Sequence, residues 1–178
     1  MMRKRLFWWE LAGFTVTAAL GALLHFTYAW SGGWDVAAAF SAVNESVWEH
    51  MKLLFFPVFL FSVVQVCVMG RNYPNFLAVR ALSLLTGLAL IPVLFYTYTG
   101  VWGSHALWAD VAVFLLADLG AFWLDFRLLG RNRLSSGWQQ VAGLLLLWGL
   151  AFLFVFFTFR PPRVDLWRDM AAGLYGIP

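Results

Sequence analysis

The sequence is poor in cysteine and in charge. Its single cysteine, Cys67, lies within an apolar run, so the chain cannot form an internal disulfide or a paired-cysteine metal motif. Only 12% of the 178 residues are charged, whereas 62% are hydrophobic. Soluble domains are roughly half apolar and about a quarter charged. The composition therefore excludes an ordinary soluble domain and predicts an integral membrane protein.

Motifs for nucleotides, nucleic acids and common zinc enzymes are also missing. No glycine-rich phosphate loop follows a predicted strand, and the zinc motif HExxH does not occur. The net charge is +3, but the basic residues stand in short groups beside apolar runs rather than among exposed aromatic residues. We therefore expect membrane lipid as a partner and no binding to nucleic acid.

Long apolar runs dominate what the sequence does contain. A transmembrane helix needs about 20 mostly apolar residues. Five segments qualify: 6–30, 45–70, 75–100, 105–127 and 137–159. No stretch is left for a separate soluble domain, so residues 1–178 are predicted to form one membrane domain. The expected fold class is an all-α, polytopic membrane helical bundle with five transmembrane helices.

Two further segments are too short to span. Residues 32–43 predict a short helix in the membrane interface, with Asp35 as its N-cap. Residues 160–178 predict an ordered tail at one membrane face, able to fold over the bundle as a lid or to remain an exposed end.

The basic residues predict the orientation of the bundle. Near the ends of the spans, the side that holds the N-terminus carries eight lysines and arginines, and the other side carries four. The positive-inside bias places the N-terminus in the cytoplasm and the C-terminus on the extracytoplasmic side.

Histidines and carboxylates gather near the predicted outer ends of the spans. At a rise of about 1.5 Å per residue, His25, Glu49, His50, Tyr96 and Asp110 lie at similar depths, about 6–8 Å below the outer ends. Histidines with a carboxylate suit a divalent transition metal such as zinc, and a catalytic zinc keeps one position open for water. The pattern predicts a metal site from His25, Glu49, His50 and Asp110, with Glu49 and His50 catalytic. Two alternatives stay open: hydrogen-bonded interfacial side chains, and a metal-free exchange of protons between Glu49 and His50.

The motif NESVWEH begins the second span. Asn44 is predicted as the N-cap, and Glu45 then lies beside the positive end of the helix dipole. Glu45, Glu49 and Lys52 share one face of the helix, so Glu49 can pair with Lys52, or Glu45 and Glu49 can share a cation. Glu49 and His50 point about 100° apart around the helix. A site that uses both therefore needs a neighbouring span.

A second polar group lies deeper in the bundle. Asp118 falls near the middle of the fourth span, and Asp125 lies on nearly the same face. Arg80 of the third span can reach their level, and Glu10 of the first span is a further partner. The favoured interpretation is an ion pair that holds the third and fourth spans together. The alternative is a proton or cation path with Asp118 as an intramembrane relay.

Two segments carry a resemblance. NESVWEHMKL, followed by FFP, and the final FRPPRVDLWRDMAAGLYGI resemble a family of small bacterial membrane proteins of unknown function. The similarity covers essentially the whole chain, although residues 164–167 depart from the family's tail pattern, PPxxPLFxDxxTGxYGI. The resemblance implies a multi-pass protein of the bacterial plasma (inner) membrane, and it transfers no catalytic residue.

Three functions fit these observations. The first is a metal-dependent hydrolase or transferase that acts on a lipid or envelope substrate at the outer face. The second is a transporter for protons, cations or small solutes that uses Asp118. The third is a non-catalytic accessory or assembly subunit, which would act as a homo-oligomer or with a membrane partner protein.

Overall fold

A computed structural model describes residues 2–131 and 133–177. Within these residues, five long helices are each long and apolar enough to cross a membrane. They are α1 (Met2–Trp30), α3 (Val47–Met69), α4 (Phe76–Trp102), α5 (Leu107–Leu129) and α6 (Gly137–Phe159). The shorter elements are α2 (Asp35–Phe40), η1 (Gly70–Asn72) and η2 (Asp165–Trp167). The all-α bundle of five membrane-spanning helices is thereby confirmed.

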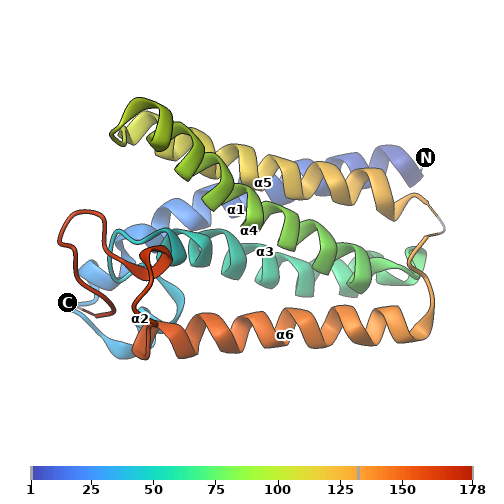
Figure 1. Ribbon diagram of the computed structural model, residues 1–178. Coiled ribbons are helices and arrows are strands. Elements are labelled where there is room, and N and C mark those ends of the chain that lie inside the picture. The colour runs from blue at the N-terminus through green and yellow to red at the C-terminus, as the bar shows by residue number, and fades with distance from the viewer. Residues whose placement is uncertain (1, 132, 178) are drawn as a thin grey trace.

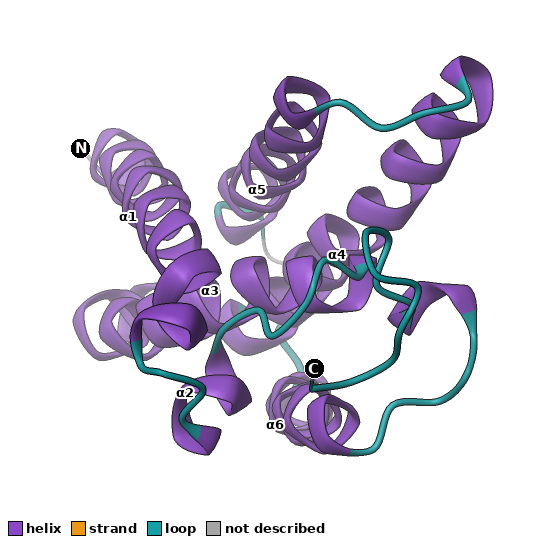
Figure 2. Ribbon diagram, turned by 90° about the vertical axis from the view of Figure 1, so that its left-hand side faces the viewer, coloured by secondary structure: helices purple, strands orange, loops and turns teal. Residues whose placement is uncertain are grey.

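The long helices lie side by side along one axis. Helix α4 packs against α3, α5 and α6, while α1 packs against α3 and α5. Figure 1 shows α1 beginning at one end of the bundle, with α2 and the segment after α6 at the other. Figure 2 looks onto this second end, where the segment after α6 crosses over the helix ends. We call it the tail end of the bundle and the first the N-terminal end.

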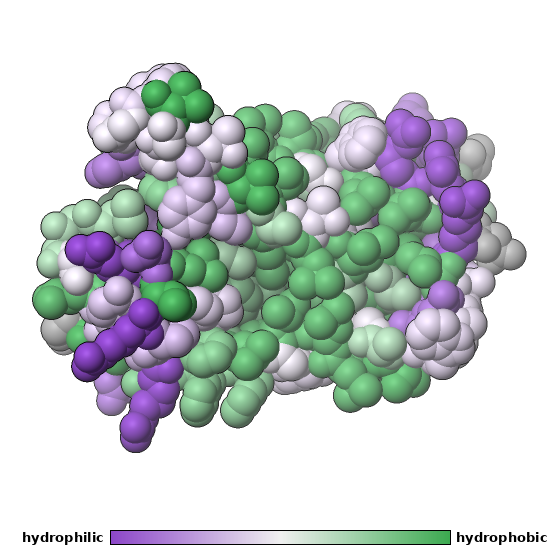
Figure 3. Space-filling model, viewed as in Figure 1, coloured by the Kyte–Doolittle hydropathy of each residue, from purple (hydrophilic) through white to green (hydrophobic). Residues whose placement is uncertain are grey.

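The surface of the bundle carries an apolar belt. Figure 3 shows hydrophobic residues across the middle of one face and hydrophilic residues at both ends. Many large apolar side chains are exposed along α6, including Trp138, Leu145, Trp148 and Phe152. A soluble protein rarely exposes so broad an apolar area, whereas a bilayer requires it. The chain is a multi-pass membrane protein.

The core lies where α3, α4 and α6 meet. Leu54 and Phe55 of α3, Leu84 of α4 and Phe154 of α6 are fully buried there. Helix α6 approaches the backbone of α4 closely at Gly143, where a Cβ atom would lie 2.7 Å from the carbonyl oxygen of Leu77. A residue without a side chain is needed at such a contact between membrane helices.

Helix α3 begins later than the sequence predicts. The prediction of Asn44 as its N-cap is wrong, because the N-cap is Ser46, whose Oγ accepts a hydrogen bond from the backbone N–H of Glu49. Asn44 instead accepts from the N–H of Ser46 and donates to the carbonyl oxygen of Gly176, at 2.9 and 2.8 Å. Because these two hydrogen bonds occupy the Asn44 side chain, the N-cap position is taken by Ser46.

The short interfacial helix is present as α2, packed against α1, α3 and α6. The prediction of Asp35 as its N-cap is wrong: Trp34 occupies that position without a side-chain hydrogen bond, and Asp35 is the first helical residue. A carboxylate in the first turn still lies at the positive end of the helix dipole.

The tail folds over the start of α3. The ring of Trp167 stacks on that of Trp48, with centroids 4.7 Å apart. Arg168 and Tyr175 form an isolated antiparallel bridge. Together with the Asn44 bond to Gly176, these contacts show an ordered tail that covers part of the bundle end.

Candidate functional site

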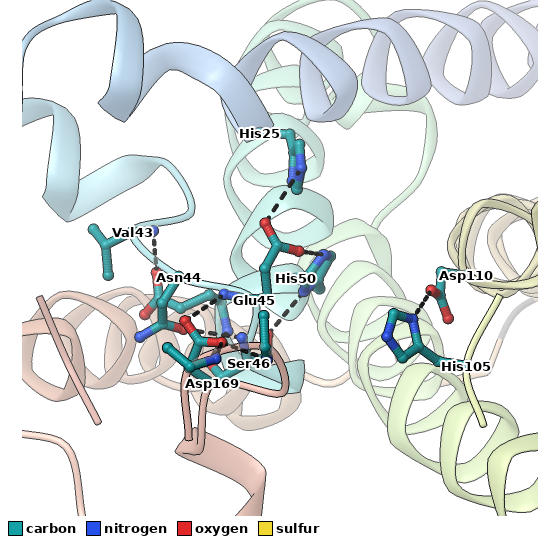
Figure 4. A network of polar contacts seen from close by, with 12 residues as sticks. His25, Val43, Asn44, Glu45, Ser46, His50, His105, Asp110 and Asp169 are labelled. Carbon is teal, nitrogen blue, oxygen red and sulfur yellow. Dashed lines mark hydrogen bonds and ion pairs between the residues drawn. The ribbon is translucent and has the colours of Figure 1, made fainter. Parts of the chain in front are cut away.

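Three side chains from separate segments meet at the tail end of the bundle. Glu45, in the loop before α3, lies between His25 of α1 and His50 of α3 (Figure 4). Its carboxylate oxygens are 3.7 Å from Nε2 of His25 and 3.5 Å from Nε2 of His50. One ligand atom from each residue lies within 4.8 Å of the other two. We call this group the histidine cluster.

The backbone fixes which nitrogen of His50 carries a hydrogen. Its Nδ1 lies 2.8 Å from the carbonyl oxygen of Ser46, which can only accept. Nδ1 is therefore the donor, and in the neutral ring the lone pair is on Nε2, facing Glu45. A lone pair and a carboxylate oxygen repel each other unless a proton or a cation lies between them. The same backbone bond is the usual means of orienting a histidine that binds a metal.

The cluster has the donor set of a catalytic zinc site. Two imidazoles and one carboxylate bind zinc at about 2.0–2.2 Å, which separates neighbouring ligand atoms around a tetrahedral ion by roughly 3.4 Å. The distances from Oε1 of Glu45 to His25 and from Oε2 of Glu45 to His50 are close to that value, and one ligand atom from each of the three residues lies within 4.8 Å of the others. The side chains of His25 and His50 are 29% and 32% exposed, and that of Glu45 is 52% exposed. An ion there would keep a position open to water.

Glu49, which the sequence analysis placed among the ligands, lies away from the histidine cluster. Its carboxylate forms a buried ion pair with Nζ of Lys52 at 2.7 Å and accepts from the backbone N–H of Val43 at 3.1 Å. Lys52 also donates to the hydroxyl of Thr158 in α6 and to a carbonyl oxygen of α2. This second group, the lysine cluster, ties three helices together and has no exposed ligand atom.

Asp110 lies near the histidine cluster but outside it. It accepts from the phenol of Tyr98 and lies 3.3 Å from Nδ1 of His105. Figure 4 shows this pair to one side of His50. A cavity of about 100 Å³ adjoins both groups, since Glu45, His50, His105 and Asp110 all line it. Its other walls are apolar. Tyr96, also among the sequence candidates, is not part of this lining and is 41% exposed.

Comparison with known proteins places the chain in a family. One family model, described as a family of unknown function (DUF6512), matches residues 2–177. The chain belongs to this family. No curated protein and no solved structure matches it.

The deeper charges of this family member form a closed network. Arg80 of α4 binds Asp125 of α5 at 2.8 Å, which is the predicted ion pair between these two spans. Arg80 also donates to Gln65 of α3, and Gln65 donates to Glu10 of α1 at 2.7 Å. These side chains are all at least 95% buried. We call this group the arginine network. It joins four helices.

Asp118 stands apart from the arginine network. Both of its oxygens lie 2.9 Å from the hydroxyl of Thr17 in α1, and the residue is fully buried. Thr17 therefore links α1 to α5 about two turns away from Asp125.

Sequence reasoning missed Glu45 as a partner of the histidines and missed Gln65 and Thr158 altogether. Glu45 was explained by the helix dipole or by sharing a cation with Glu49, and its place in the loop before α3 follows from the later start of that helix. A glutamine within a long apolar run was an available signal for Gln65, because buried polar side chains in membranes find partners. No such signal existed for Thr158, because a threonine in a membrane helix often donates a hydrogen bond to a backbone carbonyl of its own helix.

Proposed function

We propose that this protein is a zinc-dependent hydrolase of the bacterial plasma membrane that acts on a lipid or envelope substrate. The observation that carries the proposal is the histidine cluster, in which His25, Glu45 and His50 bring three ligand atoms within 4.8 Å of one another. The positive-inside bias supports an N-terminus in the cytoplasm. The tail end, and with it the site, then faces the extracytoplasmic side.

The donor set supports hydrolysis rather than a purely structural ion. A zinc ion with three protein ligands lowers the pKa of its bound water towards 7 and so generates a hydroxide that attacks a carbonyl or phosphoryl centre. His105 and Asp110 line the same cavity as Glu45 and His50. Asp110 accepts from Nδ1–H of His105 at 3.3 Å, so Nε2 carries the lone pair and can take a proton from the attacking water and pass it to the leaving group.

The cavity, with a volume of about 100 Å³, can hold only part of a lipid, and its walls support a substrate with an apolar part beside the reacting group. Beside the polar groups, the lining consists of Val47, Ile91, Phe95, Val113, Phe114, Met170 and Ala171. The cavity lies at the end of membrane-spanning helices, where a lipid ester or phosphoester has its polar head near water and its chains in the bilayer.

Metal analysis tests the proposal first. The purified protein, stripped with a chelator and dialysed against zinc, should bind one zinc per chain. His25→Ala, Glu45→Gln and His50→Ala should each lower the affinity at least about 100-fold, because losing a ligand exceeds the tenfold to 100-fold cost of losing an outer-shell partner. The site would be excluded if the wild type bound no zinc, or if all three variants bound zinc as tightly as the wild type.

Measurements of turnover test the proposed hydrolase activity. Lipid esters and phosphoesters offered in mixed micelles should be hydrolysed by the zinc-loaded wild type and not by Glu45→Gln. His105→Ala is the matched variant, because it should keep the zinc and lose turnover. A zinc-loaded wild type that hydrolyses none of these substrates contradicts the hydrolase assignment while leaving the metal site intact.

The two other functions have less support. A transporter would use Asp118, yet both oxygens of that side chain face Thr17 in a fully buried position. A proton flux in liposomes that Asp118→Asn abolishes would favour it. An accessory subunit would copurify with a partner at fixed stoichiometry.

A further inference from the structure

A large cavity lies at the N-terminal end of the bundle, opposite the histidine cluster. It has a volume of about 450 Å³ and lies between the start of α1, the end of α5 and the loops that follow α3 and α5. Small-molecule sites in proteins have about 300–1,000 Å³. The cavity is therefore large enough for a lipid headgroup.

The side chains around this cavity carry mainly positive charge. Arg3, Arg127 and Arg131 line the cavity, and no carboxylate does. The nearest acids along the chain, Glu10 and Asp125, are buried in the arginine network. Four more exposed basic residues flank the cavity: Lys4, Arg5, Arg71 and Arg133. An anion is the ligand that such a surface attracts.

Two of the lining arginines are held by aromatic rings. The guanidinium of Arg3 lies over the ring of Phe126, at 5.5 Å from its centroid, and that of Arg127 lies over Trp123, at 5.1 Å. Trp123 is 55% exposed on a membrane-spanning helix, so its ring faces lipid. The cavity therefore adjoins the bilayer, and its charges are positioned before any ligand arrives.

The third arginine is held through its backbone. Asn75 is 1% exposed, and its Nδ2 donates to the carbonyl oxygens of Leu128, Arg131 and Arg133 at 2.9–3.1 Å. These bonds fix the loop after α5 as one wall of the cavity. They place Arg131 with the other two arginines.

We infer that this cavity binds the phosphate headgroup of an anionic phospholipid through Arg3, Arg127 and Arg131. Guanidinium groups bind phosphate oxygens in pairs, and basic pockets between membrane helices select anionic headgroups. The acyl chains remain in the bilayer beside Trp123. The site lies at the other end of the molecule from the histidine cluster and does not depend on the function proposed for that cluster.

Native mass spectrometry of the full chain in detergent tests the inference. The wild type should retain phosphatidylglycerol in preference to phosphatidylcholine. In a variant with Arg3→Gln, Arg127→Gln and Arg131→Gln, the affinity should fall at least about 100-fold, because each lost hydrogen bond to a charged phosphate lowers affinity roughly tenfold or more. Lys4→Gln, Arg5→Gln and Arg71→Gln together remove the same charge from the same end but leave the cavity lining unchanged. The affinity of this control variant for phosphatidylglycerol should fall by less than about tenfold.

Three outcomes would overturn the inference. Equal losses in the two triple variants would mean that general surface charge attracts the lipid. Wild-type affinity in the glutamine variant of the lining arginines would mean that these residues do not hold the headgroup, and thermal unfolding of that variant controls for misfolding. Glycerol 3-phosphate that displaces bound phosphatidylglycerol at equal concentration would identify a soluble phosphate as the ligand.

Discussion

The histidine cluster and the arginine network are built from similar acidic and basic side chains but differ in burial and in the length of their contacts. Each brings acidic and basic side chains together from separate segments of the bundle. In the arginine network, Arg80, Gln65 and Glu10 are at least 95% buried and bind one another directly. In the histidine cluster, Glu45 is 52% exposed and its contacts with the two imidazoles are 3.5–3.7 Å long.

This difference separates a structural network from a candidate site. The charges of the arginine network pair with one another in the interior of the bundle, where water does not reach them. The side chains of the histidine cluster are partly exposed to water. Access to water, rather than the presence of charged residues, therefore marks the candidate site in this membrane protein.

Removing the centre of the arginine network should have the largest effect. Arg80→Ala leaves Asp125 and Glu10 buried without their counter-charge, which costs about 3–5 kcal/mol of unfolding free energy. Denaturation of the detergent-solubilised protein with SDS measures this loss. Arg133→Ala, at an exposed position, is the control. A loss no greater than that of the control would contradict the structural role of the network.

The lysine cluster should show a smaller loss. Glu49→Gln removes the counter-charge of Lys52, although Ala38 and Thr158 still accept from its amino group. We expect a loss of about 2–3 kcal/mol in the same denaturation assay. Zinc bound per folded chain should be unchanged. A variant that keeps its stability but loses zinc would return Glu49 to the ligand set.

The cap of α3 should come next. Ser46→Ala removes the acceptor for the backbone N–H of Glu49 and should cost about 1 kcal/mol. Asn44→Ala should instead loosen the tail, because it removes the bond to Gly176. Trypsin cleavage at Arg168 reports tail release. Faster cleavage in the Ser46 variant than in the Asn44 variant would reverse the two roles.

Glu45→Gln should have the smallest effect on stability. The residue is exposed and lies in a loop, so the metal-free protein should change by no more than about 0.5 kcal/mol. Its zinc affinity, measured by competition with a chelator, should nevertheless fall at least about 100-fold. The comparison of the two regions fails if Glu45→Gln destabilises the metal-free protein as much as Glu49→Gln does.

The spans and one ion pair could be predicted from the sequence for a simple reason. Long apolar runs bounded by polar loops have only one arrangement in a bilayer, so the predicted segment 137–159 coincides with Gly137–Phe159. The pair of Arg80 with Asp125 followed from depth, because the rise along a helix fixes how far each residue lies from the membrane face.

The composition of the histidine cluster could not be predicted in the same way. Depth places Glu45 and Glu49 at the same end, but rotation about the helix axis and the path of the preceding loop decide which carboxylate meets the histidines. Both depend on packing: Lys52, held by Thr158 of α6, takes Glu49 as its partner. The sequence contains no local signal of that contact, which joins residues 106 positions apart.

The bond between Asn44 and Gly176 has a consequence for the order in which the protein is made. Ribosomes add residues from the N-terminus, so His25, Glu45 and His50 enter the membrane long before Trp167 and Gly176 exist. Until then, the loop that carries Glu45 lacks the contacts that hold it. The three side chains of the histidine cluster therefore reach their final arrangement only after all five spans have been inserted, so any ligand that needs the complete cluster can bind only late in biogenesis.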